Sequence, residues 1–175
     1  MFKIATLITN DSYLVQGSIR SHLSVNKHIT EEDMYNALEK VNLKDFVVEN
    51  GGLDYQLSCG ASNLSGGQKQ RLLAAKAILK DSYIYILDEA VSNIDDYSKK
   101  IVLDAFDSIK NGKIIVVISH DLETITNSDN IYVLKDQQII EEGTHEQLID
   151  QPSLYKKLFN DQQQLKEKFL AKEVE

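Results

Sequence analysis

The sequence predicts an α/β fold in which a parallel sheet is flanked by helices. Residues 83–87 combine aliphatic and tyrosine side chains, and residues 114–118 form a continuous β-branched run. Between them, residues 95–109 have a helical pattern. Uninterrupted apolar strands separated by a helix indicate a parallel sheet covered on both faces. Residues 3–9 supply a further strand, which leads into the polar turn at residues 10–12.

The stretch after the first strand is predicted to be mainly helical. Residues 17–24 can form a short helix. Thr30 begins a clearer one, because Thr30 and Asp33 resemble a capping box and an apolar face follows them. Residues 43–48 form another short helical segment, which the glycines within residues 49–53 interrupt.

The C-terminal part of the chain has a different pattern. Residues 131–134 and 138–141 are expected to pair as a hairpin with a turn at residues 135–137. The segment after Thr144 is helical and increasingly charged, and residues 162–175 are expected to form a solvated helix or a frayed tail.

Composition indicates a globular protein of ordinary hydrophobicity. The 175 residues are enough for one domain with a real core, and 42% of them are hydrophobic while 26% are charged. The formal net charge of -8 argues against a nucleic-acid-binding surface. A single cysteine, Cys59, rules out an internal disulfide framework and suits a reducing compartment. No signal peptide and no bilayer-length apolar run are recognised.

Two motifs point to the chemistry of a nucleotide phosphate. Residues 64–68, Leu-Ser-Gly-Gly-Gln, open a helical run at residues 67–79. A glycine pair at a helix N-terminus offers backbone N–H groups and a positive dipole end to an anion, although an isolated Ser-Gly-Gly is more often a simple loop. The apolar strand at residues 83–87 delivers Asp88 and Glu89 to its C-terminal end, where they can serve as a metal ligand and a base.

Two weaker motifs follow in order. Residues 92–95, Ser-Asn-Ile-Asp, are a helix-start signal and by themselves indicate only an N-cap. His120 follows the strand at residues 114–118, where a lone histidine is more often structural than functional. The four motifs gain specificity from their order and spacing.

With these motifs the chain resembles the nucleotide-binding domain of ATP-binding cassette (ABC) transporters of the exporter type. The matching segments are the signature motif at residues 64–68, the Walker B strand at 84–89, the D-loop at 92–95, the switch histidine His120, the Q-loop region at 10–20 and the exporter-type sequence at 142–148. The resemblance runs from about residue 4 to about residue 160. It implies a P-loop NTPase-like fold with an α-helical signature subdomain and with the N-terminal part of the fold missing.

The resemblance also implies how the chain is organised. Residues 1–175 would form a single partial ABC ATPase domain. Its helical subdomain would span residues 17–62, with the signature motif at its edge, and its α/β core would comprise residues 1–16 and 69–160. Residues 161–175 would form the C-terminal helix or tail.

The family implies a role for each matching residue. Asp88 would hold Mg²⁺, usually through water, Glu89 would act as the general base, and His120 would sense the γ-phosphate. Ser65, Gly66 and Gly67, with Gln68 completing the motif, would bind the γ-phosphate of ATP held by a different subunit. Asp95 would join the subunits and couple the two sites.

Two departures from the family pattern bear on activity. Asn10 stands where the family has the Q-loop glutamine, and it would reach the nucleotide site or Mg²⁺ only through a bridging solvent molecule. No Gly-x-x-x-x-Gly-Lys-Ser/Thr pattern occurs in the 175 residues. The simplest expectation is a truncated domain with exposed apolar surface and self-association, which binds ATP weakly and hydrolyses it negligibly. Whether this chain alone is an enzyme therefore stays open.

The implied partners are a second nucleotide-binding domain, in a homo- or heterodimer, and the transmembrane domain of a transporter. Residues 12–24 are the candidate surface for that membrane domain, with Tyr13, Leu14 and Val15 exposed. The implied location is cytoplasmic, at the inner face of the cell membrane. The alternative is a non-catalytic module that supplies the signature motif in trans to an intact ATPase subunit. An ABC ATPase of DNA repair or translation is disfavoured by the acidic charge and the exporter-like segments.

Overall fold

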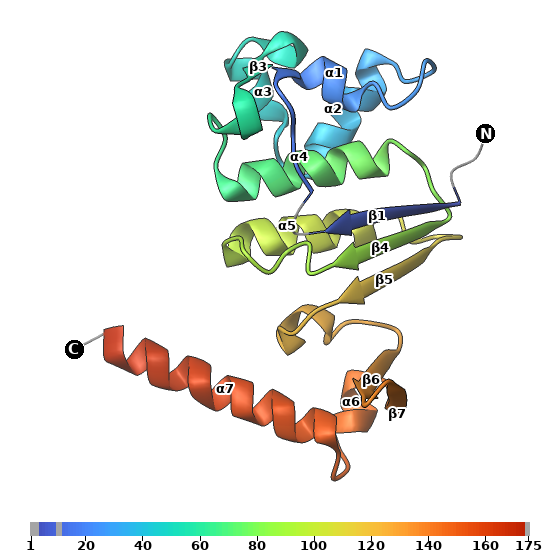
Figure 1. Cartoon of the computed structure of the whole chain (residues 1–175), viewed down its shortest axis with the longest axis vertical. Coiled ribbons are helices and arrows are strands. Elements are labelled where there is room, and N and C mark those ends of the chain that lie inside the picture. The colour runs from blue at the N-terminus through green and yellow to red at the C-terminus, as the bar shows by residue number, and fades with distance from the viewer. Residues whose placement is uncertain (1–3, 10–11, 174–175) are drawn as a thin grey trace. The chain divides into compact units, whose positions relative to one another are not determined.

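The computed structural model describes residues 4–9 and 12–173, with side chains described as far as residue 168. The chain divides into two compact units, Met1–Ile118 and Ser119–Glu175. The first unit contains the elements β1 (Ala5–Thr9), β2 (Gly17–Ser18), α1 (Ile19–Leu23), α2 (Glu31–Lys40), α3 (Lys44–Glu49), β3 (Gln56–Leu57), α4 (Gly66–Ile78), β4 (Ile84–Asp88), α5 (Asp96–Asp107) and β5 (Ile114–Ile118). Figure 1 shows these elements in chain order.

A parallel sheet of three strands forms the centre of the first unit. Its order is β1-β4-β5, and helix α5 makes the crossover from β4 to β5. The register aligns Thr9, Asp88 and Ile118, so that the three strands end at the same edge. The predicted α/β class and parallel pairing are confirmed.

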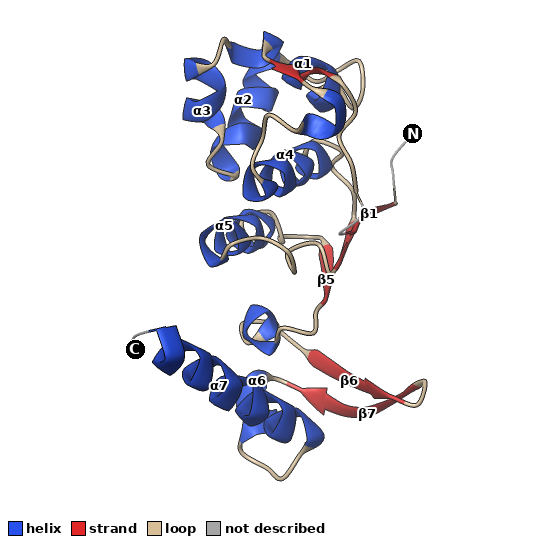
Figure 2. Ribbon diagram, turned by 60° about the vertical axis from the view of Figure 1, so that its left-hand side comes forward, coloured by secondary structure: helices blue, strands red, loops and turns tan. Residues whose placement is uncertain are grey.

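Helices α4 and α5 cover only one face of this sheet (Figure 2). The covered face carries the buried side chains Thr6, Ile8, Tyr85 and Leu87. The opposite face exposes Leu7, Ile114, Val116 and Ile118, with Leu7 at 57% and Ile114 at 59% exposure. The expectation that both faces are covered is therefore wrong for the described residues. The expected exposed apolar surface is present, whereas self-association stays a prediction.

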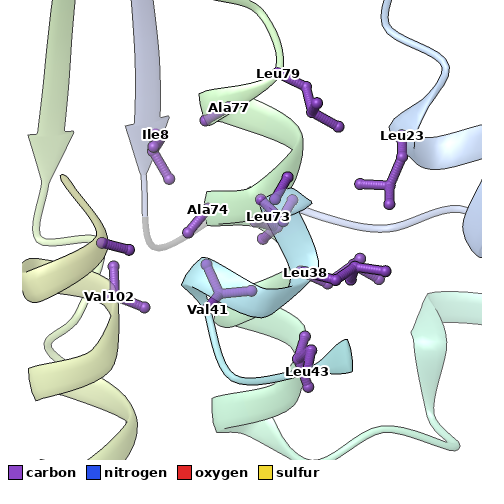
Figure 3. Close-up of a cluster of buried hydrophobic side chains, with 14 of the residues drawn as sticks. Ile8, Leu23, Leu38, Val41, Leu43, Leu73, Ala74, Ala77, Leu79 and Val102 are labelled. Atoms are coloured by element: carbon purple, nitrogen blue, oxygen red, sulfur yellow. The ribbon is translucent and has the colours of Figure 1, made fainter. Parts of the chain in front are cut away.

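Helix α4 lies at the centre of the main hydrophobic core. Its residues Leu73, Ala74 and Ala77 approach β1 and α5 on one side and the helices α1 and α2 on the other (Figure 3).

The predicted capping box starts α2, because the Asp33 N–H donates to Thr30 Oγ1 and Thr30 N–H donates to the Asp33 carboxylate. These reciprocal hydrogen bonds fix the start of α2.

The segment after β1 differs from the sequence prediction in two details. The helix predicted at residues 17–24 begins only at Ile19, because Gly17 and Ser18 form the two-residue strand β2, which pairs antiparallel with β3. Leu14 is buried at 3% exposure, against the expectation that it is exposed. Its neighbours Tyr13 and Val15 are exposed at 79% and 57%, as predicted.

The second unit consists of a hairpin and three helical segments. Its elements are a short 3₁₀ helix (Leu122–Ile125), β6 (Ile131–Lys135), β7 (Gln138–Gly143), α6 (His145–Ile149) and α7 (Leu154–Glu173). The predicted hairpin is present, and Asp136 and Gln137 form its turn with the positive φ angles that tight hairpins require. Ile131, Leu148 and Tyr155 make a small core of their own. Of the two expectations for residues 162–175, a helix is observed as far as Glu173.

Candidate functional site

The carboxyl edge of the parallel sheet holds the first group of predicted site residues. Asp88 ends β4 and is half-buried, whereas Glu89 is exposed and directly follows the strand. Because Asp88 pairs in register with Thr9 and Ile118, its carboxylate emerges where all three parallel strands end. Ligands of open α/β sheets bind at this edge.

Glu89 has a left-handed backbone with a φ angle of 48°. Its N–H donates to the Ile118 carbonyl at 2.9 Å, and its carbonyl accepts from the Ser92 N–H at 3.1 Å and from Ser92 Oγ at 2.9 Å. Non-glycine residues in this region are strained, and such strain gathers at functional sites. The turn therefore fixes Glu89 just beyond Asp88.

The carboxylates at this edge suit one kind of metal binding. Magnesium in nucleotide sites is usually held by one or two carboxylates, with waters and substrate phosphates completing the shell. Asp88 fits that role, and within the described part of the chain no group of three or more His, Cys, Asp or Glu side chains is placed to hold a metal by itself. Asn10, the other expected contributor, lies outside the described residues.

The signature pentapeptide forms a capped helix start. Ser65 is the N-cap of α4: the Gln68 N–H donates to Ser65 Oγ at 3.1 Å, and the Ser65 N–H donates to Gln68 Oε1 at 2.8 Å. Ser65 and Gly66 are exposed, while Leu64 and Gly67 are buried. The first N–H groups of a helix have no acceptor within it, and the dipole adds positive potential there. This turn can therefore receive an anion.

Asp95 begins α5 in a similar way. Its Oδ1 accepts from the Ser98 N–H at 2.8 Å, so that Asp95 is the N-cap of α5. Hydrogen bonds from the Ser98 backbone and side chain lower the pKa of Asp95 below its usual value, and the positive charge of Arg71 on α4 lowers it further. Asp95 is accordingly an anion placed near the signature helix.

His120 belongs to the second unit and is exposed. Gln162 of α7 secures the backbone on both sides of Asp121, because its Nε2 donates to the His120 carbonyl and its Oε1 accepts from the Leu122 N–H. Lys166 also pairs with Asp121 and Glu123, and its hydrogen bond is the main cause that lowers the pKa of Glu123. Helix α7 thus holds the segment that carries His120.

Sequence reasoning missed several of these structural residues. The Ser65–Gln68 capping box follows the pattern Ser/Thr-x-x-Glu/Gln, which is readable from the sequence. No comparable signal marks Gln162 or Lys166, since their contacts lie about 40 residues away in a segment expected to be solvated. The structure places Asp88, Glu89, the signature turn and Asp95 in one unit and His120 in the other.

Comparison with known proteins places the chain in a family. A family model described as ABC transporter matches residues 4–92, which is just over half of the chain. The chain belongs to the ABC transporter family. The signature turn and the sheet-edge carboxylates lie within the matched residues, and Asp95 lies just beyond them.

Individual relatives agree with this family. An uncharacterized ABC transporter ATP-binding protein of Haemophilus influenzae is 42% identical over 95% of this chain and 30% of its own length. An ATP-dependent lipid A-core flippase of Saccharophagus degradans is 37% identical over 89% of this chain and 27% of its own length. A solved structure of a bacterial Atm1-family ABC exporter with ATP bound matches 91% of this chain and 28% of its own chain, with 25% identity and a TM-score of 0.83.

This ABC chain spans less than a third of the length of each of these relatives. Among the helices that the structure describes, none could span a lipid bilayer.

Proposed function

We propose that the chain is part of the ATP-binding domain of an ABC exporter, whose parent couples ATP hydrolysis to moving a substrate across a membrane. The observation that carries this proposal is the exposed, capped turn of Ser65 and Gly66 at the start of α4. Relatives that include a lipid A-core flippase and an exporter with ATP bound support it.

The sheet-edge residues would act on a nucleotide held beside them. Asp88 would hold Mg²⁺, which neutralises phosphate charge when it is bound. Glu89 would orient and polarise the attacking water, since the turn that fixes its backbone leaves its side chain exposed. His120 would contact the γ-phosphate. Asn10 would contribute only through solvent.

The signature turn would serve a nucleotide on another subunit. Ser65, Gly66 and Gly67, together with Gln68, would meet the γ-phosphate of ATP that a second nucleotide-binding domain cradles, and Asp95 would join the two subunits. The 175 residues contain no P-loop pattern, and Asp88 and Glu89 alone repel phosphate. The isolated chain would therefore bind ATP weakly and hydrolyse it negligibly.

The membrane partner would contact residues 12–24. Tyr13 and Val15 present exposed apolar side chains there, whereas the buried Leu14 anchors the segment to the core. Exposed apolar residues that gather in one segment can mark an interaction surface. In this arrangement the chain lies at the cytoplasmic face of the membrane.

A second candidate function is a non-catalytic module that completes the site of an intact subunit. The capped signature turn favours it, because that turn is complete without a P-loop. In both candidates the signature turn contacts ATP on another subunit. In the second candidate, Asp88 and Glu89 of this chain take no part in ATP hydrolysis.

A mixing experiment tests both. The nucleotide-binding domain of the Haemophilus influenzae relative, with its own signature serine replaced by arginine, is titrated with this chain, and ATP turnover is measured. We expect this chain to raise turnover at least tenfold and Ser65→Arg to abolish the increase, because the longer cation blocks the turn. The substitution Lys69→Arg, one residue beyond the motif, is the matched control and keeps the increase.

The variant Glu89→Gln is a second control. In this mixture the ATP lies on the P-loop of the partner, so both candidates predict that Glu89→Gln leaves the turnover unchanged, and a lowered turnover would contradict the trans arrangement. An increase that survives Ser65→Arg contradicts both.

A further inference from the structure

The two glycines of the signature motif have opposite surroundings. Gly66 is exposed, and a methyl group added to it would meet no atom within 4 Å. Gly67 is buried, and a methyl group there would lie 2.2 Å from Ser98 Oγ, 2.8 Å from Ser98 Cβ and 2.8 Å from Asp95 Oδ2. Both residues have ordinary helical backbones, without a positive φ angle. Residue 67 must therefore be glycine because there is no room for a side chain, and not because of its backbone conformation.

The atoms that face Gly67 belong to one hydrogen-bonded turn at the start of α5. Ser98 is 3% exposed, and its N–H is held at 2.8 Å by the carboxylate of Asp95, the N-cap of α5. Helices α4 and α5 lie side by side in both views (Figures 1 and 2). Because the contact includes Ser98 Cβ, rotation of the serine hydroxyl alone cannot make room for a larger residue.

A second contact connects the same helices one turn further along. Arg71, four residues after Gly67, donates from Nη1 to the Asn42 carbonyl at 2.8 Å. The Asn42 side chain in turn donates to the hydroxyl of Tyr97 on α5 at 2.6 Å. Asn42 has a positive φ angle of 50° and lies just after α2. The segment after α2, the signature helix α4 and the start of α5 are therefore linked by hydrogen bonds. We call this contact region, from Gly67 and Arg71 to Asp95, Tyr97 and Ser98, the joint.

We propose that Gly67 is a positioning residue whose missing side chain lets the signature helix dock directly on the Asp95 turn. The signature motif and the D-loop of one chain then move as a single body, and a displacement of Asp95 reaches Ser65 and Gly66. The functional consequence rests on the proposed ATP site. The joint itself is a property of the chain without nucleotide.

Thermal unfolding of the chain with single alanine substitutions tests the joint. Gly67→Ala is expected to lower Tm by roughly 5 °C, because it overpacks a buried contact. The matched control Gly66→Ala, which adds the same methyl group in open space, is expected to leave Tm unchanged or to raise it by a few degrees. Equal Tm values for the two variants would overturn the proposal.

Rescue by a second substitution makes the test independent of poor folding. Ser98→Gly removes both Cβ and Oγ, so that the double variant Gly67→Ala/Ser98→Gly is expected to recover at least half of the Tm that Gly67→Ala loses, relative to Ser98→Gly alone. If Gly67→Ala does not fold, recovery of folding in the double variant supports the joint. A double variant no better than the additive sum of the single changes contradicts it.

A carboxyl titration by ¹³C NMR reports the contact directly. Displacing Ser98 is expected to move the Asp95 pKa upward toward its ordinary value in Gly67→Ala and to leave it unchanged in Gly66→Ala. A purely structural loss of stability would not shift this pKa in the folded protein. Because no nucleotide is present, failure here overturns the joint alone, whereas failure of the mixing experiment overturns the proposed function.

Discussion

At the scale of single residues, Glu89 shows how the backbone and the chemistry of the site are connected. A glutamate with a φ angle of 48° is held by hydrogen bonds from its own N–H to Ile118 and from Ser92 to its carbonyl. A left-handed backbone costs an L-residue about 1–2 kcal/mol. The chain keeps a carboxylate at a position where glycine would be less strained, as it keeps non-glycine residues at five further left-handed positions among the described residues.

The strain at Glu89 leads to a stability prediction. Glu89→Gly should be more stable than Glu89→Ala by about 1 kcal/mol, because only glycine adopts this backbone without a steric cost. Urea denaturation of the two variants measures the difference. At Asn36, an exposed residue within α2, the same pair of substitutions should have the opposite order. Alanine more stable than glycine at residue 89 would show that this backbone is unstrained.

At the scale of elements, the α7 helix and the segment that carries His120 form one hydrogen-bonded unit. Gln162 uses both ends of its amide to hold the backbone at residues 120 and 122, and Lys166 adds ion pairs to Asp121 and Glu123. Since α7 also packs through Tyr155 on Ile131 and Leu148, the position of this segment depends on the small core of the second unit.

Removal of the Gln162 amide should loosen this segment. Gln162→Ala loses two hydrogen bonds and is expected to destabilise the second unit by about 1–2 kcal/mol. The expected readouts are faster hydrogen exchange at the Leu122 amide and a shifted NMR signal of the His120 ring. Gln164→Ala, on the exposed side of the same helix, is the matched control. If both variants exchange at the wild-type rate, α7 does not hold the segment.

The sequence allowed the regular elements to be predicted where local patterns are strong. The β-branched run at residues 114–118 and the Thr30–Asp33 capping box act over a few residues, and each is found as predicted. Strand β2 was missed because two residues carry no periodicity. Burial of Leu14 was missed because an apolar residue in an irregular segment gives no sign of which side it faces.

The site, too, could be predicted only where its residues lie close together in the sequence. The residue types at the sheet edge and in the signature turn were evident from spacing, since each is local to one strand end or one helix start. Two further features join distant parts of the chain. Gly67 lies close to Ser98, and Gln162 forms hydrogen bonds with the backbone of residues 120 and 122. Such contacts depend on tertiary packing, which a single sequence does not specify.

At the scale of the whole molecule, the chain carries an apolar sheet face and a signature turn that both remain exposed. Leu7, Ile114, Val116 and Ile118 lie together on the uncovered face of the sheet. Parallel sheets are normally covered on both faces. A chain of this kind is expected to function in contact with other protein surfaces, and under the proposed function the exposed Ser65 and Gly66 would contact an ATP-bearing partner.

The most direct test of this account is photocrosslinking with an ATP analogue that carries its reactive group on the γ-phosphate. The chain is mixed with the nucleotide-binding domain of the Haemophilus influenzae relative and irradiated, and the labelled peptide is identified by mass spectrometry. If Ser65 to Gln68 contact ATP held by the partner, the label appears at residues 65–68 and only when the partner is present. Equal labelling of these residues without the partner, or labelling confined to other parts of the chain, would contradict it.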